Sequence, residues 1–364
     1  MADGMSDRSD AQASHSPAAL DWRRWAGVAL PLVLLAALLL YDTFGASAYE
    51  RRVIVILGID IILVLSLNLF SGFTGVFSLG HVGFMALGAY ASAILSMPVA
   101  QKAINLPDLP SWLATVELGF LPATLAAGIL AAVVALLIGL PVLRLSGHYV
   151  VVATLSFLVI VHVVLINAVP FTRGSRTFFG TPAYTTVWWV YAWVLITIYI
   201  AWRVLRSPYG RAMLAQREDR VAARAVGVEV LRTRLWPFAL SAFLTAVAGA
   251  LWGHYILSFS PNAFFFAETF AIITMLVVGG MGSISGSVIG TVLIVVLTEV
   301  LRNMEGGFDL GFAQVPPLYG LSQILMATAF ICVLVFRREG LLGNTEIDFT
   351  RLFATGQRGQ GNGV

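Results

Sequence analysis

Few side chains in this sequence could carry out chemistry, and the most conspicuous of them stand inside long apolar stretches. Asp60 lies in the middle of one such stretch, and His81 lies in the next. An ionisable side chain inside a bilayer costs about 2.5–3.5 kcal/mol on insertion scales, so each needs a functional or a hydrogen-bonding reason. Asp60 and His81 could relay protons, which would make the chain an ion-coupled carrier. The alternative, which we favour for His81, is a structural hydrogen bond between helices.

The familiar motifs of hydrolytic and metal centres are missing from the sequence. Its only lysine, Lys102, is not part of a G-x-x-x-x-G-K-[ST] loop of the kind that cradles nucleotide phosphates. The five histidines show no spacing typical of metal ligands, and neither H-E-x-x-H nor G-x-S-x-G occurs. We therefore expect no catalytic residue, no metal site and no cofactor in this chain.

The composition defines the class of protein. Of the 364 residues, 59% are hydrophobic and only 11% are charged, and the mean hydropathy is +0.87. Soluble domains average about 25% charged residues, so an aqueous core could not hide this much apolar sequence. We predict an all-α polytopic membrane protein.

Apolar stretches of about 17–25 residues predict the spanning helices. There are about ten: Ala26–Phe44, Val53–Phe70, Val76–Met97, Leu118–Leu143, Tyr149–Ala168, Val187–Leu205, Leu235–Phe259, Ala267–Gly279, Ile284–Leu301 and Leu318–Phe336.

The placement of Arg and Lys predicts the orientation. With the N-terminus inside, cytoplasmic segments hold about three quarters of the 22 basic residues, as the positive-inside rule requires. Both termini are then cytoplasmic. We predict a disordered tail over residues 1–25, a permease domain over 26–336 with a cytoplasmic loop at 206–234, and a second tail over 337–364. Ala46–Ala48 also resembles a signal-peptide cleavage site, which leaves open whether the first span is removed.

Two glycine-rich segments interrupt the apolar pattern, one over Leu67–Tyr90 and one over Gly279–Gly290. Such segments at corresponding places in two halves are typical of broken helices, related as inverted repeats, beside a transport path. The alternative is close packing through small residues, as in a scaffold. The candidate path residues are Asn68, Gly75, Ser78, Gly80, His81, Phe84, Gly279, Gly280, Gly282 and Ser283.

The loop Arg206–Arg234 predicts an amphipathic helix. Ser207 is a suitable N-cap, Pro208 suits the first helical position, and Gly227 suits the end. Its arginines could lie on anionic lipid or merely enforce topology. Because acidic residues are mixed among them, we favour a docking helix for a cytoplasmic partner.

The signature of the first glycine-rich segment resembles that of a known family. The pattern LN…GxxGxxSLGHxxFxxxGAY runs from Leu67 to Tyr90 and is similar to that of LivM-type permeases of branched-chain amino-acid ABC importers. The similarity extends from about residue 55 to 343, through Gly147–Phe157, Ser207–Val228, Phe238–Tyr255, Ser260–Phe266, Val277–Thr291 and Arg338–Gly343.

This resemblance implies partners and a mechanism. The chain would pair with a LivH-like sister permease in the prokaryotic plasma (inner) membrane. Two cytoplasmic ABC ATPase subunits would bind ATP and Mg²⁺, and an extracytoplasmic binding protein would deliver the substrate; no nucleic acid is involved. The permease would move amino acids, branched-chain ones first, by alternating access.

The resemblance also points to residues that couple the permease to the ATPases. The E-A-A-x-x-x-G pattern of ABC importers corresponds to Val221, Ala222, Ala223 and Gly227, with Val in place of Glu. Glu218 or Asp219 could replace the lost acid. The candidate coupling residues are Arg211, Glu218, Asp219, Ala222, Ala223 and Gly227.

One outer loop departs from the family pattern. Between Thr172 and Pro182, where relatives often carry an acidic residue, this chain has Arg176. Urea and short-chain amide permeases belong to the same wider family, so an amide substrate is the alternative to an amino acid.

Overall fold

The computed structural model describes residues 45, 47–145, 147–305, 308–309 and 314–315, and the single positions 320, 324, 327, 328, 331, 335 and 340. These residues fall within one compact unit, Gly45–Ile347. The predicted span 26–44 lies outside the described residues, as do most of the span 318–336 and of both predicted tails.

Helices make up almost all of the described chain. The longer ones are α2 (Ala48–Leu67), α3 (His81–Ser96), α6 (Phe120–Val142), α7 (His148–Asn167), α9 (Val187–Leu205), α12 (Val230–Ile256), α13 (Phe266–Gly279) and α14 (Ile284–Glu305). The shorter ones are α4 (Val99–Asn105), α5 (Ser111–Ala114), α8 (Val169–Thr172), α10 (Pro208–Glu218) and α11 (Arg220–Ala225). A π-helical turn, η1 (Asn68–Gly72), extends α2, and a 3₁₀ turn, η2 (Pro261–Phe264), precedes α13. The strands β1 (Phe308–Asp309) and β2 (Gln314–Val315) pair antiparallel, with Phe308 opposite Val315.

The spans confirm the polytopic helical class. Seven helical stretches among the described residues are long and apolar enough to cross a membrane, or eight if the bent pair α3–α4 counts as one span. The eight predicted spans between residues 53 and 301 each fall on one of them. The predicted outer loops are more structured than expected, because they contain α4, α5 and α8.

The third predicted span needs correction. Its helix begins at His81 rather than at Val76, and the chain bends by 119° between α3 and α4. The bend falls at Met97–Pro98 and not at the glycines. Proline disfavours helical dihedrals in the residue before it and has no N–H to donate, and Met97 is accordingly extended, with ψ 133°.

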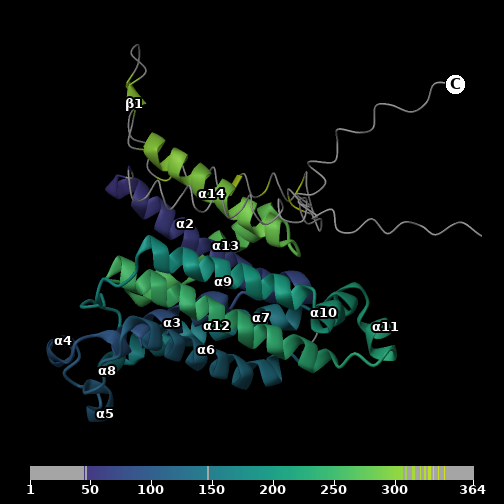
Figure 1. Ribbon diagram of the computed structural model, residues 1–364, viewed down its shortest axis with the longest axis horizontal. Coiled ribbons are helices and arrows are strands. Elements are labelled where there is room, and N and C mark those ends of the chain that lie inside the picture. Colours follow the sequence, from purple (N-terminus) through teal and green to yellow (C-terminus); the bar gives the residue numbers. More distant parts are fainter. Residues whose placement is uncertain are drawn as a thin grey trace, which may run out of the picture. The chain divides into compact units, whose positions relative to one another are not determined.

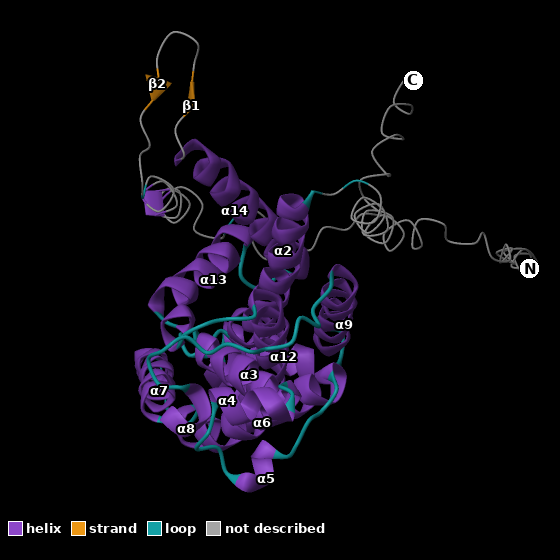
Figure 2. Ribbon diagram, turned by 90° about the vertical axis from the view of Figure 1, so that its left-hand side faces the viewer, coloured by secondary structure: helices purple, strands orange, loops and turns teal. Residues whose placement is uncertain are grey.

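Helix α12 is the centre of the packing (Figure 1). It lies against α3, α6 and α2, while α2 also contacts α9 and the α13–α14 pair. Figure 1 shows α10 and α11 at one end of the long helices, which we call the α10 end. The short helices α4, α5 and α8 lie at the opposite end, the α4 end. Figure 2, from the side, shows α2, α13 and α14 next to one another.

Helices α3 and α12 are so close that their backbone atoms are in direct contact. A Cβ atom added at Gly88 would lie 2.1 Å from the carbonyl oxygen of Ala246, and one at Gly249 would lie 2.0 Å from that of Met85. Small residues allow helices to approach this closely, which is how many membrane helices associate.

The outer surfaces of α6 and α7 are apolar. Leu130, Leu137, Val152 and Ile160 are exposed on them. In water such surfaces would be unfavourable, whereas lipid chains cover them without cost. These helices therefore suit the periphery of a membrane domain.

Gly249→Leu tests the α3–α12 contact. We expect it to lower the free energy of unfolding by about 1–3 kcal/mol or more, because the new side chain meets fixed backbone. Thermal unfolding of the detergent-solubilised protein measures the change. Gly119→Ala is the control, since its Cβ would meet only Pro122, at 3.9 Å. Equal stability of the two variants would contradict the packing argument.

Candidate translocation site

Asn68 joins the two glycine-rich segments. Its Nδ2 donates to the carbonyl oxygen of Ser283 at 2.9 Å, and its Oδ1 accepts from the N–H of Gly282 at 2.8 Å. The side chain is fully buried. One amide thus satisfies a donor and an acceptor of the turn between α13 and α14. We call this pair of bonds the Asn68 clasp.

The clasp fits because glycines surround it. A Cβ at Gly72 would lie 1.7 Å from Asn68 Oδ1 and 2.7 Å from the nitrogen of Gly282. Gly280 and Gly282 have φ of 114° and 93°, a region that favours glycine. Ser283 then begins α14, its Oγ accepting from the N–H of Gly286 at 3.0 Å. The turn therefore depends on its glycines for conformation as well as for space.

The two helices on either side of this turn, α13 and α14, are also in backbone contact. A Cβ at Gly279 would lie 2.2 Å from the carbonyl oxygen of Gly286, and one at Gly290 would lie 2.4 Å from the Cα of Gly279. Gly340, in the Arg338–Gly343 motif, reaches the same turn, and its Cβ would lie 2.6 Å from the Cα of Gly280.

Helix α10 packs directly on the first glycine-rich segment. Met213 is fully buried in a cluster with Leu69 and Phe73, which flank or belong to η1. Arg217, one helical turn further along, donates from Nη1 to the carbonyl oxygen of Gly72 at 2.8 Å. Gly75, with φ of 69°, lies against the same arginine: its Cβ would be 3.0 Å from Arg217 Cγ. Helix α10 and the signature segment are therefore packed together.

The prediction of a single amphipathic helix in this loop is wrong, because the helix is interrupted at Asp219. Ser207 caps α10 as predicted, accepting from the N–H of Gly210 at 3.2 Å. Asp219 then caps a second helix, α11, accepting at Oδ1 from the N–H groups of Val221 (2.7 Å) and Ala222 (3.0 Å). These bonds lower the pKa of Asp219. Side-chain competition for backbone N–H groups is what makes aspartate a helix starter.

The other predicted coupling residues lie around this break. Arg211, Glu218, Asp219 and Ala222 are exposed, whereas Ala223 is buried. Gly227, with φ of 87°, ends α11 as predicted. Exposed apolar side chains on and next to α11 are Val221 and Val226, at 78% and 80%.

His81 belongs to a separate cluster between α3, α7 and α12. Its Nδ1 and Nε2 lie 3.0 Å from the hydroxyls of Ser78 and Ser241. Ser241 already donates to the carbonyl oxygen of Phe238 at 2.9 Å, so it accepts from Nε2–H, and Ser78 donates to Nδ1. The imidazole is then neutral and fully hydrogen-bonded.

Aromatic rings enclose that histidine. Phe70, Phe84 and Phe238 lie 5.9, 6.2 and 6.0 Å from it between ring centroids. Gly80 brings α7 close, since its Cβ would lie 2.6 Å from the carbonyl oxygen of Thr154. The predicted path residues thus divide into the Asn68 clasp and this histidine cluster, which Phe70 of η1 connects.

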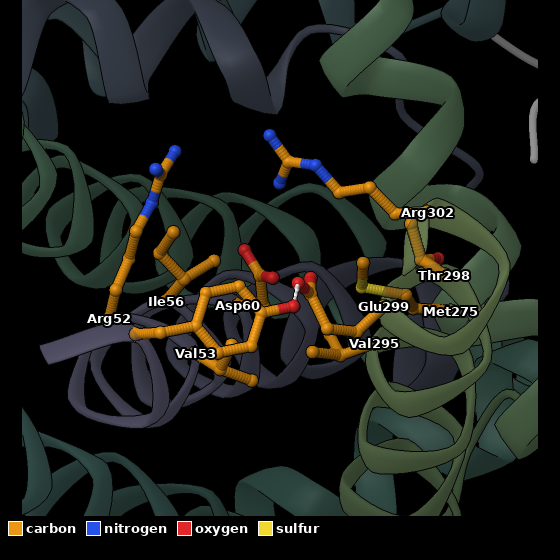
Figure 3. A pocket seen from close by; sticks show the side chains of 10 residues that line it. Arg52, Val53, Ile56, Asp60, Met275, Val295, Thr298, Glu299 and Arg302 are labelled. Atoms are coloured by element: carbon orange, nitrogen blue, oxygen red, sulfur yellow. Dashed lines mark hydrogen bonds between the residues drawn. The ribbon is translucent and has the colours of Figure 1, made fainter. Parts of the chain in front are cut away.

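A pocket of about 300 Å³ lies between α2, α13 and α14 (Figure 3). It begins beside the first turn of α2 and the last turns of α14, away from the clasp. Its lining residues are Tyr49, Arg52, Val53, Ile56, Asp60, Met275, Val295, Thr298, Glu299 and Arg302. Tyr49 donates its phenol proton to Glu299.

Asp60 is part of this pocket and not of the histidine cluster. Its carboxyl group lies near Glu268, while both nitrogens of His81 bond to serines. The hydrogen bonds of the described residues do not connect Asp60 to His81.

Several residues of these sites were not selected from the sequence. The sequence indicates Arg217 only as one of the loop arginines that set the membrane orientation. It nevertheless follows Met213 by four residues and so shares its helix face. Arg52, Glu299 and Arg302 stand at the ends of predicted spans, where charged residues are ordinary. Only the convergence of three helices identifies them as a group.

Spanning helices joined by a glycine turn, with a buried polar clasp between them, are the arrangement of a polytopic membrane transport protein. The family model described as "Branched-chain amino acid transport system / permease component" matches residues 51–334. The chain therefore belongs to this family: it is a multi-pass permease component of the bacterial branched-chain amino acid ABC transport type, and a transmembrane subunit rather than an enzyme.

Individual relatives agree with this assignment. The high-affinity branched-chain amino acid transport permease LivM of Escherichia coli K12 is 29% identical over 348 residues, covering 86% of this chain and 75% of its own. A probable LivM of Methanocaldococcus jannaschii is 26% identical, covering 78% and 90%. LivH of Escherichia coli K12 is 30% identical over 161 residues, covering 43% and 46%. No solved structure matches the chain significantly.

Asn68→Leu tests the clasp. The substitution keeps the size of the side chain but leaves the N–H of Gly282 without its Asn68 acceptor, while the carbonyl of Ser283 keeps its bonds from the N–H and hydroxyl of Ser287. We expect a loss of about 1–3 kcal/mol of stability from the buried N–H group, with faster amide hydrogen exchange over residues 280–286. Asn167→Leu is the control, because Asn167 is exposed and bonds only within its own helix, to Val163. A clasp variant as stable as this control would overturn the assignment.

Proposed function

We propose that this chain moves amino acids, branched-chain ones first, across the prokaryotic plasma membrane by alternating access. The α10 end faces the cytoplasm, because the arginine-rich segment 206–234 lies there. Both termini are then cytoplasmic, and the α4 end faces outward. A LivH-like sister permease completes the membrane part, and an extracytoplasmic binding protein delivers the substrate.

The observation that carries this proposal is the contact of α10 with the signature segment. Arg217 bonds to the carbonyl oxygen of Gly72, and Asn68, in the same π-helical turn, bonds to the α13–α14 turn. A force applied to α10 therefore reaches two spanning segments through direct contacts. This is the connection that an externally driven permease requires.

The surface beyond α10 suits a protein partner. Val221 and Val226 are exposed apolar residues flanked by Glu218 and Asp219. We assign this surface to one of the two ABC ATPase subunits, which bind ATP and Mg²⁺.

ATP binding on those subunits supplies differential affinity for two permease conformations. The candidate path residues, from Asn68 to Phe84 and from Gly279 to Ser283, are the moving parts in this scheme. The two glycine-rich segments are corresponding elements of inverted repeats, within a total of about ten spans. In this scheme His81 is a structural residue. The alternative of a proton relay between Asp60 and His81 then lacks one of its two groups.

Association with an ATPase and the energy source of uptake test the function. We expect the purified complex to contain ABC ATPase subunits, and uptake of branched-chain amino acids to stop on ATP depletion and to persist when the proton gradient is collapsed. Uptake that follows the proton gradient, in a chain that never co-purifies with an ATPase, would refute the importer function. Uptake of urea or amides in place of amino acids would select the alternative substrate.

Arg217→Gln tests the coupling contact specifically. We expect ATPase subunits still to co-purify, while ATP-dependent uptake falls at least tenfold, because the charge-assisted bond to Gly72 is lost. Arg232→Gln is the matched control: this arginine is exposed, and among the residues that the structure describes it pairs only with Glu229, at 3.2 Å. Normal uptake in the Arg217 variant would contradict the proposal that α10 transmits movement from the ATPase to the permease.

A further inference from the structure

The pocket between α2, α13 and α14 has two poles of opposite charge. Figure 3 shows the guanidinium groups of Arg52 and Arg302 on one side and the carboxylates of Asp60 and Glu299 beneath them. The remaining lining is mainly aliphatic or thioether. A volume of about 300 Å³ is at the small end of ligand pockets, so it suits a small molecule.

The acidic pole includes a carboxylate that lacks a donor. Asp60 is only 8% exposed, and no hydrogen bond to it occurs within the described residues. Glu268 lies near it, and within the described residues Glu299 accepts a hydrogen bond only from the phenol of Tyr49. A buried carboxylate normally finds a hydrogen-bond donor. An ammonium group, with three donors and a positive charge, matches this pole.

The basic pole has the complementary chemistry. Arg52 and Arg302 are exposed, and neither forms an ion pair with another residue in the described ranges. A guanidinium fork binds a carboxylate through two parallel hydrogen bonds. Arg52 directly follows the first turn of α2 and Arg302 is in the last turn of α14, so they stand at the mouth of the pocket.

We propose that this pocket is a recognition site for the zwitterion of an α-amino acid during its entry into the permease. The ammonium group binds at Asp60 and Glu299, and the carboxylate binds at Arg302 and Arg52. A branched aliphatic side chain packs against Ile56, Met275 and Val295. This inference rests on the proposed function, because the pocket opens at the α4 end, where that function places the delivered substrate.

The site also distinguishes amino acids from the alternative substrates. Urea and short-chain amides carry no ammonium group, so they would leave the buried carboxylate of Asp60 without compensation. Leaving buried polar groups unpaired is what allows a site to reject an analogue.

Three ligands separate the two poles experimentally. Leucine carries both charges, 3-methylbutylamine retains only the ammonium group, and 4-methylpentanoate retains only the carboxylate. Saturation-transfer NMR on the full chain in nanodiscs, with the subunits that co-purify with it, measures their binding. We expect leucine to bind roughly ten- to hundredfold more tightly than either analogue.

Two variants should then show opposite patterns. Asp60→Asn weakens the binding of leucine and of the amine about tenfold or more and leaves the carboxylate analogue unchanged. Arg302→Gln weakens the binding of leucine and of the carboxylate analogue and leaves the amine unchanged. A structural role would move all three ligands together. Arg302 is exposed, so its variant stays informative even if Asp60→Asn fails to fold. Asp108→Asn and Arg176→Gln, exposed positions elsewhere, are the controls and should alter none of the three.

The outcomes separate this inference from the proposed function. Equal binding of the three ligands, or variants that affect all ligands alike, would overturn the zwitterion site even where uptake remains ATP-dependent. Uptake that ignores ATP, together with charge-selective leucine binding, would overturn the importer function and retain the site.

Discussion

The bonds between Asn68 and the α13–α14 turn are the constraint on which the rest of the site depends. A helix ends and another begins at that turn, where N–H groups at the start of a helix lack helical partners. Asn68, from a helix far away in the sequence, accepts from the N–H of Gly282 and adds a donor to the carbonyl of Ser283. The amide therefore fixes the relative position of three spanning helices at one end.

The pocket lies between the same three helices, α2, α13 and α14, towards the end opposite the Asn68 clasp. Helix α2 has 20 residues, which at 1.5 Å per residue separates its first turn from Asn68 by about 30 Å. Arg52 and Asp60 therefore share a rigid element with the clasp. The same helices are therefore affected by two events. One is movement of α10 against η1 at one end, and the other is binding of a ligand in the pocket at the other end. Coupling by rigid elements requires only that they have two stable arrangements.

Much of this fold could be predicted from the sequence, because membrane-spanning helices can be recognised from the length and hydrophobicity of their segments. Asn68 and its glycines were also recognised as candidates, and Ser207 and Gly227 were recognised as helix limits. The pairings were not predicted, although Ser283 was itself a candidate: Ser283 and Ser241 meet Asn68 and His81 only through tertiary packing. The break at Asp219 was missed because the apolar periodicity continues across it, and a local cap outweighed that pattern. Pro98 could have been identified as the bend from its own chemistry.

The backbone contact between α3 and α12 has a consequence for evolutionary comparison. At Gly88 and Gly249 the partner atoms are carbonyl oxygens of Ala246 and Met85, which every amino acid possesses. No compensating substitution on the opposite helix can make room for a side chain. In an alignment of homologues these positions would show invariant glycine without any correlated change. Methods that infer contacts from paired substitutions would then be blind to one of the tightest helix crossings in the molecule.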